Sequence, residues 1–419
     1  MTVKVTTLPS GLRVTSAHMP HLETTAVGMW VDVGARCEKR RGNGVSHLLE
    51  HMAFKGTSRR SARQIAEEIE AVGGQLNAYT SREQTAYYAR VLKDDMPLAI
   101  DILGDILQHS TFADQELERE REVVIQEIGE TNDTPDDVVF EHLQSSAYPG
   151  QALGRSILGT VDLVRGFSRD TLRHYMNEQY RAPAMVLSAA GNIDHDRLVA
   201  LAEKSFAGFD GPPADNREAA CYAGGDGRER RDLEQVHLTL GFNGLAFEDP
   251  DFYALQVFST VLGGGMSSRL FQEVRETRGL AYSVYSFSTS FIDGGLFGVY
   301  AGTGPGQVGE LVPVIADVMG EIAAAAEDKE VGRARAQLKA GLLMSLESSS
   351  ARCEQIARQL LIFGRIIPVE ELIEQVDAVD AQAVRKVARR ILAAGKPTVA
   401  AVGPIERLEP YDRIAARFN

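Results

Sequence analysis

Part of the pattern of strands and helices occurs twice along the sequence. The two copies are separated by the same number of residues as Gly191 and Gly403. The segments "RAPAMVLSAAGNID" and "GKPTVAAVGPIE" each have the pattern of a strand that runs into a glycine turn, at Gly191 and Gly403. The same offset separates two Tyr-Ala pairs that begin at Tyr88 and Tyr300, and a helical pattern follows each pair. Two matches at one offset in similar contexts predict a duplicated domain.

The predicted domains meet near the middle of the chain. Between residues 206 and 232, glycine, proline and charged residues replace the periodic hydrophobic residues. We therefore predict an N-terminal catalytic, metal-binding domain over 1–206, a linker over 207–232 and a homologous C-terminal domain without a metal site over 233–419. Within each half, strands and amphipathic helices mix without regular βαβ alternation, which predicts an α+β fold. Each domain would be a mainly antiparallel sheet with helices packed on one face.

Composition and cysteine usage narrow the class of protein. The 419 residues are 44% hydrophobic, enough for two globular domains, and no stretch approaches the ~18 to 20 apolar residues of a membrane span. The start "MTVKVTTLPSGLRV" alternates like a strand, so no secretory signal is expected. Cys37, Cys221 and Cys353 are far apart and lack CxxC spacing, which favours a reducing compartment and hence the cytoplasm. A net charge of −14 argues against nucleic-acid binding and is compatible with basic substrates.

The sequence "HLLEH" places two histidines and a glutamate at helical spacing. At roughly 100° per residue, His47 and His51 lie about 40° apart, and Glu50 lies about 60° to the other side of His47. Two imidazoles one turn apart can bind Zn²⁺, and a neighbouring carboxylate that does not bind the metal can act as a general base. A lone HxxEH also arises by chance on a solvated helix face, so a metal site requires a third ligand.

The helix predicted over "ELEREREVVIQEIGE" offers two candidates for that ligand. Glu120 and Glu127 are seven residues apart, about 20° from perfect alignment on one helix face. Glu127 stands among apolar residues, and a carboxylate buried there would need a partner. The partner is a metal ion or, in the alternative, Arg121 or another base at the edge of the apolar stripe.

Longer segments resemble the pitrilysin family of zinc peptidases with the inverted HxxEH motif. The resemblance is to small bacterial members similar to the catalytic beta subunit of the mitochondrial processing peptidase, and it covers nearly the whole chain. The matching segments are "GLRV", "NGVSHLLEHMAFKGT", "GGQLNAYTSREQTAYYARVL", "EREREVVIQEI" and "GGGMSSRLFQEVRETRGLAYSVYSF".

The resemblance implies one Zn²⁺ per chain, bound by His47, His51 and Glu127. In the family the third ligand is a glutamate at a set distance beyond the second histidine, and in this sequence that distance leads from His51 to Glu127. Glu50 would be the general base as metal-bound water attacks the peptide carbonyl, and Glu120 would support the site without binding the metal.

The duplication provides an internal comparison for this assignment. Applying the repeat offset to the three ligands and Glu50 leads to side chains that cannot form the same site. They are Ser259, Leu262, Gly263 and Lys339. We therefore expect the metal site in the first half only.

Two other segments match family positions that contact substrate. "LNAYTS" has the pattern of an edge strand, whose free backbone groups can bind an extended peptide. The resemblance places Asn77 and Ala78 along the substrate, although without it an ordinary interior strand is the simpler interpretation. Arg275 and Tyr282 match an arginine and a tyrosine that reach the substrate carbonyl. Arg278 competes with Arg275, and a helix-end arginine with a core tyrosine is the alternative.

Together these features predict a zinc metalloendopeptidase, a hydrolase that cleaves extended peptides or unfolded segments, with basic presequence-like peptides favoured. The alternative is a noncatalytic structural subunit, like the relatives of this family that are core proteins of a respiratory complex. Such relatives typically lose part of the metal motif, whereas every position of it is filled here.

The expected partners are a peptide substrate and a second copy of the chain, without nucleic acid or membrane. Family members that act as single chains have about twice this length and further domains, which favours assembly from two copies here. The prediction is a homodimer in which Arg275 and Tyr282 of one chain complete the active site of the other.

Overall fold

A computed structural model describes residues 3–212, 214 and 217–418. The chain forms two compact units, each with one sheet and its own hydrophobic core. The first unit comprises Met1–Gly129, Ser156–Glu218 and Leu343–Ile366. The second unit comprises Glu130–Arg155, Ala219–Leu342 and Ile367–Asn419.

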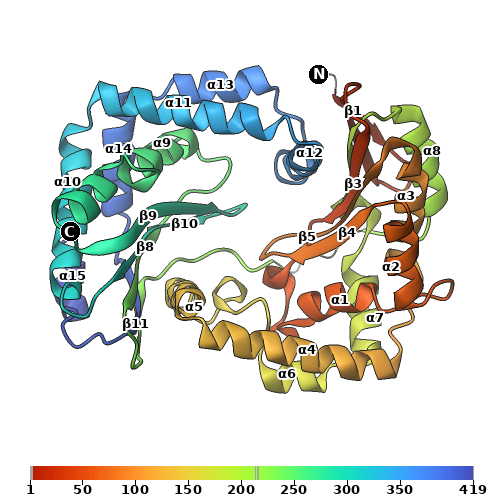
Figure 1. Ribbon diagram of the computed structural model, residues 1–419, viewed down its shortest axis with the longest axis horizontal. Helices are drawn as coiled ribbons and strands as arrows, with labels where there is room; N and C mark the ends of the chain where they lie inside the picture. Colours follow the sequence, from red (N-terminus) through yellow and green to blue (C-terminus); the bar gives the residue numbers. More distant parts are fainter. Residues whose placement is uncertain (1–2, 213, 215–216, 419) are drawn as a thin grey trace. The chain divides into compact units, whose positions relative to one another are not determined.

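A six-stranded sheet forms the centre of the first unit (Figure 1). Adjacent strands are antiparallel except β2 and β6, which are parallel. In sheet order the strands are β1 (Val3–Thr7), β2 (Arg13–His18), β6 (Met185–Gly191), β3 (Thr24–Val31), β5 (Thr85–Leu92) and β4 (Gln75–Thr80). The main helices that belong to this half of the sequence are α1 (Val45–Ala53), α2 (Ala62–Ala71), α3 (Met96–Gln108), α4 (Asp114–Asp133), α6 (Val161–Gly166), α7 (Arg169–Gln179) and α8 (His195–Ser205).

The second unit has a five-stranded sheet with the same kind of pairing. Only β7 and β11 are parallel, and the other adjacent pairs are antiparallel. In sheet order the strands are β7 (Gly225–Arg230), β11 (Thr398–Gly403), β8 (Val236–Asn243), β10 (Gly295–Thr303) and β9 (Ala281–Ser290). The helices from the second half of the sequence are α9 (Phe252–Gly263), α10 (Val308–Ala325), α11 (Asp328–Ser345), α12 (Ser349–Phe363), α13 (Val369–Asp377), α14 (Ala381–Leu392) and α15 (Tyr411–Ala415).

The predicted duplication and the predicted α+β class are confirmed. Strands β2 and β3 of the first sheet correspond to β7 and β8 of the second. The first and last residues of each pair are separated by the same number of residues as Gly191 and Gly403. These two glycines, which first indicated the repeat, both adopt a positive φ, +137° at Gly191 and +133° at Gly403. A Cβ atom at either glycine would lie 2.4 Å from a backbone oxygen, of Thr24 and Gln235 respectively, so both copies require glycine there.

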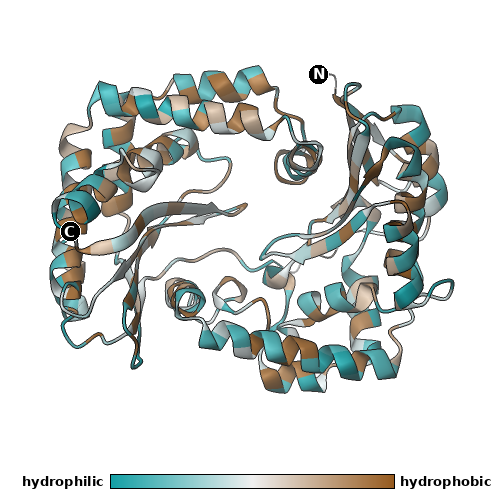
Figure 2. Cartoon of the chain, viewed as in Figure 1, coloured by the Kyte–Doolittle hydropathy of each residue, from teal (hydrophilic) through white to brown (hydrophobic). Residues whose placement is uncertain are grey.

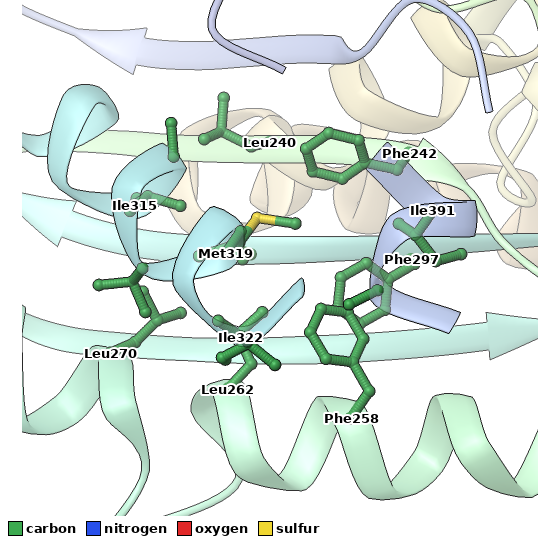
Figure 3. Packing of buried hydrophobic residues seen from close by; sticks show 14 of the residues in the cluster. Leu240, Phe242, Phe258, Leu262, Leu270, Phe297, Ile315, Met319, Ile322 and Ile391 are labelled. Atoms are coloured by element: carbon green, nitrogen blue, oxygen red, sulfur yellow. The ribbon is translucent and has the colours of Figure 1, made fainter. Parts of the chain in front are cut away.

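Alternate residues of the strands pack on opposite faces of each sheet, as the pleat requires. In β3, Val27 and Met29 join the core formed with α1 and α3, whereas Ala26 and Trp30 face the other way. In the second unit, leucine, isoleucine and phenylalanine side chains from β8, β10, α9, α10 and α14 interlock in one core (Figure 3). The helices are correspondingly amphipathic, with hydrophobic residues on one side and hydrophilic residues on the other (Figure 2).

Each sheet has one helix on its second face, and that helix comes from the other half of the sequence. In the first unit α12 packs against β6 and β3 through Cys353, Ile356, Ala357 and Leu360. In the second unit α5 (Pro135–Ala147), the equivalent of α12, packs against β11 and β8. Figure 1 shows α12 and α5 each on the opposite side of its sheet from the other helices of that unit. The compact units exchange these two segments relative to the predicted domains, and in the sequence they meet between Glu218 and Ala219, within the predicted linker 207–232, which also contains strand β7.

Among the described residues, no helix is both long enough and apolar enough to cross a lipid bilayer.

Candidate metal centre

Helix α1 presents its polar side chains to the site because its apolar side chains are buried in the core. Val45, Leu48, Leu49 and Met52 are all at most 2% exposed. This packing fixes the rotation of the helix, so His47, Glu50 and His51 lie on the remaining, partly exposed face.

Two imidazoles and one carboxylate converge from α1 and α4. Nε2 of His47 lies 3.6 Å from Oε2 of Glu127, and Nε2 of His51 lies 3.6 Å from Oε1 of the same residue. One possible ligand atom from each of the three residues lies within 4.8 Å of the others. Ligand atoms about 2.0 to 2.2 Å from a tetrahedral Zn²⁺ are about 3.3 to 3.6 Å apart, and the two distances from the histidines to Glu127 are at the upper end of this range.

Glu120 approaches His51 from the side away from Glu127. Its Oε2 atom lies 3.2 Å from Nδ1 of His51, and its Oε1 atom accepts from Nζ of Lys55 at 2.8 Å. Glu120 is 5% exposed and does not belong to the converging group. A carboxylate bonded to the outer nitrogen of a metal-binding histidine fixes the ring and its tautomer, and this is the geometry that Glu120 has.

The ionisation of the two histidines differs. Burial, together with the charge of His51, lowers the pKa of His47 to about 4, so this imidazole is neutral at pH 7 as a metal ligand must be. Burial also opposes protonation of His51, but the hydrogen bond to Glu120 and the charges of Glu127 and Glu50 outweigh it and raise the pKa. Conversely, burial of Glu120 is outweighed by its bonds to His51 and Lys55, which lower the pKa of this carboxyl group.

Glu50 lies beside the converging group of His47, His51 and Glu127 without belonging to it. The Thr80 hydroxyl on β4 donates to its Oε2 atom at 2.5 Å. Burial raises the pKa of Glu50, and the Glu127 charge acts in the same direction, against the Thr80 hydrogen bond and the charge of His51. A carboxylate whose pKa is raised towards neutrality is better suited to take and return a proton.

The surroundings of Glu127 differ from the sequence expectation in one respect. Its side chain is 37% exposed, and of the apolar neighbours on α4 only Val124 is buried, so the carboxylate is less enclosed than predicted. The alternative partner, Arg121, instead binds Glu118 at 2.5 Å and the Phe167 carbonyl oxygen.

The predicted substrate segment forms a strand at one end of the first sheet. β4 pairs with β5 on one side and is the last strand in the sheet order of the described residues. The Asn77 side-chain oxygen accepts the backbone N–H of Ala78 at 2.8 Å. Thr80, on the same strand, donates to Glu50, and the sequence motifs did not indicate this contact.

Arg275 and Tyr282 lie together in the second unit. Arg275 belongs to a π-helical turn (Phe271–Thr277), and its guanidinium lies 4.8 Å from the Phe271 ring centroid and 4.7 Å from that of Tyr282 on β9. Tyr282 is 77% exposed. The competing Arg278 instead forms ion pairs with Glu273 at 2.8 Å and Glu310 at 3.3 Å.

The equivalent positions of the second half have structural roles. Ser259 bonds to Ser286, Leu262 is fully buried in the core, and Lys339 pairs with Asp377 at 2.6 Å. At Gly263, a Cβ atom would lie 2.3 Å from the backbone nitrogen of Ser286, so the helix passes close to β9 there. In the described part of the chain, the side chains that could hold a metal ion together are His47, His51 and Glu127, and none of these four residues belongs to that group.

Comparison with known proteins extends over the whole chain. The family model described as "Insulinase (Peptidase family M16)" matches residues 13–161, and the model "Peptidase M16 inactive domain" matches residues 166–338. The chain is 41% identical to an uncharacterised zinc protease of Streptomyces coelicolor, with 100% of this chain and 92% of that protein covered. It is 39% identical to the mitochondrial-processing peptidase subunit beta of Bos taurus, with 99% and 87% covered.

A solved structure gives the same fold. A peptidase M16 inactive domain from Pseudomonas fluorescens superimposes with a TM-score of 0.91 at 21% identity, covering 98% of this chain and 100% of that one. At this identity the likeness bears on the fold alone. The full-length similarity to the relatives above confirms the resemblance that the sequence motifs indicated, and the chain belongs to the insulinase family of peptidases, M16.

Proposed function

We propose that this protein is a zinc metalloendopeptidase whose zinc is bound by His47, His51 and Glu127. The observation that carries the proposal is the convergence of these three side chains, with Glu50 beside them and outside the ligand set. One Zn²⁺ per chain would supply Lewis acidity and lower the pKa of a ligated water to about 7.

In this proposal Glu50 takes a proton from the attacking water and returns it to the leaving amine. The Thr80 hydroxyl orients the carboxylate for that transfer through its hydrogen bond to Oε2. Glu120 holds the His51 ring in position through Nδ1, and Lys55 balances the Glu120 charge.

We further propose that substrates bind as an added strand along β4. An added strand must be extended, which favours peptides and unfolded segments over folded proteins. Asn77 and Ala78 would contact the substrate backbone. For this, the hydrogen bond from the Ala78 N–H to the Asn77 side chain must first break. The net charge of −14 and the similarity to a mitochondrial-processing peptidase subunit favour basic, presequence-like peptides.

Arg275 and Tyr282 are proposed to bind the substrate carbonyl and its developing negative charge. Their stacking supports a joint role, because the ring of the exposed Tyr282 lies against the Arg275 guanidinium. The proposed active assembly is a homodimer in which these two residues of one chain complete the site of the other. A cytoplasmic location stays a prediction from the cysteine pattern.

The test of the proposed function is the hydrolysis of a mixed peptide library before and after removal of the metal. We expect one zinc per chain, loss of cleavage with a chelator and recovery on adding Zn²⁺. Cleavage that persists in the metal-free protein would overturn the mechanism. A protein that holds zinc and cleaves nothing in the library would favour the noncatalytic structural subunit instead.

A further inference from the structure

The N-terminal end of the metal-binding helix α1 is held by a buried carboxylate that lies outside the helix. Glu38 is 4% exposed and accepts three hydrogen bonds at this end. Its Oε1 atom accepts the backbone N–H of Ser46 at 2.8 Å. Its Oε2 atom accepts the backbone N–H of Gly44 at 2.8 Å and the side-chain amide of Asn43 at 3.0 Å.

This arrangement replaces an ordinary N-cap. The first N–H groups of a helix lack partners within it and usually bond to the side chain of the preceding residue. That residue is Gly44, which has no side chain and adopts φ +97°. A Cβ atom there would lie 2.7 Å from the Leu158 carbonyl oxygen, so a larger capping residue does not fit. A negative charge at this end also complements the helix dipole.

A second buried contact fixes the same turn. The Ser46 hydroxyl lies 2.7 Å from the Tyr175 hydroxyl of α7, and these residues are 1% and 8% exposed. Ser46 directly precedes His47. The backbone and the side chain of the residue before the first histidine are therefore both held by buried polar groups.

The second half of the chain shows that the fold can be built without these contacts. At the repeat offset, Glu38 and Gly44 correspond to Pro250 and Gln256. Ser46 and Tyr175 correspond to Phe258 and Val387, which both belong to the apolar core. The polar contacts at the helix start are thus found in the half that carries the metal-binding group.

We infer that Glu38 is a positioning residue for the metal centre, acting through the N-terminal turn of α1 on His47 and His51. The inference rests on the proposed zinc site. Glu38 accepts from the two backbone N–H groups, of Gly44 and Ser46, that set where helix α1 begins. It would thereby fix the positions of the two histidine ligands.

The test measures metal binding in Glu38→Gln, which keeps the size of the side chain but loses the charge and one acceptor oxygen. Zinc affinity is measured by competition with a chromophoric chelator, and ligand geometry by the visible absorption of the Co²⁺-substituted protein. We expect a roughly tenfold or greater loss of zinc affinity and an altered Co²⁺ spectrum.

The matched control is Asp105→Asn on α3. Asp105 is a buried carboxylate of the same unit, 1% exposed, which accepts from Thr57 at 2.8 Å and Arg60 at 2.9 Å. Its substitution should lower the stability of the fold while leaving zinc affinity and the Co²⁺ spectrum unchanged. If Glu38→Gln does not fold, Tyr175→Phe, which removes only the bond to Ser46, should show a smaller change in the same two quantities.

The inference is overturned if Glu38→Gln, or Tyr175→Phe in its place, binds zinc like the wild type with the same Co²⁺ spectrum. It is equally overturned if Asp105→Asn loses as much affinity, because the effect would then be general destabilisation. A wild-type protein that binds no zinc would instead refute the proposed function on which the inference rests.

Discussion

Among the single residues of the site, Glu120 and Glu127 are both glutamates of helix α4, but they occupy different positions. Glu127 faces both Nε2 atoms, whereas Glu120 contacts only the outer nitrogen of His51 and the Lys55 ammonium. Glu127 is therefore placed to bind the metal, and Glu120 is placed to orient the ligand His51.

Glu127→Gln and Glu120→Gln should therefore weaken zinc binding to different extents. An amide oxygen is a poor ligand for Zn²⁺, so Glu127→Gln should lose most of the affinity. Glu120→Gln should lose about 10-fold to 100-fold, as is typical when a partner of a ligand is changed. Zinc competition titrations of the two variants compare them directly, and the reverse order would exchange the two assigned roles.

Thr80→Val should move the pH dependence of hydrolysis. The Thr80 hydroxyl stabilises the charged form of Glu50 and so lowers its pKa; removing the hydroxyl raises that pKa. Because Glu50 must be ionised to accept a proton, the acidic limb of the kcat/KM profile should shift to higher pH. Thr80→Ser keeps the donor and should keep the wild-type profile. An unshifted limb in Thr80→Val would show that the hydroxyl does not tune the base.

The converging side chains, Glu50 and Glu120 could be identified from the sequence, but the contacts of Thr80, Lys55 and Glu38 could not. His47, Glu50 and His51 follow from helical spacing, which is a local property. The contacts of Thr80 and Lys55 depend on how β4 and α4 pack against α1, and no short spacing in the sequence encodes that packing. The partners of Glu38 are near in sequence, but the turn that brings them to its carboxylate follows no simple spacing.

At the scale of helices and strands, the repeat itself was predictable because each copy keeps its glycine where the strand ends. The exchange of α5 and α12 was not predictable. Both helices have apolar residues at helical spacing, and this pattern does not specify which sheet each helix covers. Which sheet each helix covers depends on the path of the chain between the units.

Ile356→Ala tests whether α12 stabilises the first unit. Ile356 is fully buried against β3 and β6, so its truncation should cost about 2–5 kcal/mol. Hydrogen exchange should become faster in β3 and β6 and stay unchanged in β8 and β11. Arg358→Ala changes a side chain on the same helix that is 45% exposed and serves as the control. Unchanged exchange in β3 would show that α12 contributes little to that sheet.

At the scale of the whole molecule, the proposed homodimer can be tested by mixing two defective chains. Glu50→Gln lacks the base, and Tyr282→Phe lacks the proposed carbonyl contact while keeping the ring on which Arg275 stacks. If the site is shared, a mixed dimer contains one site with both defects and one with neither. Mixing should then restore activity towards half of the wild-type value per dimer.

Subunit exchange must be shown independently, with differently labelled chains. Exchange without recovered activity would contradict a shared site, and full activity in a protein that sediments as a monomer would contradict the dimer.

In the proposed mechanism, Glu50 is a base beside a zinc that it does not bind. The most direct measurement determines zinc content and peptide hydrolysis on the same preparation of Glu50→Gln. We expect one zinc per chain with wild-type affinity and hydrolysis reduced roughly 10²-fold to 10⁴-fold, because the amide cannot accept the proton. Hydrolysis near the wild-type rate, or loss of the zinc, would contradict the proposed mechanism.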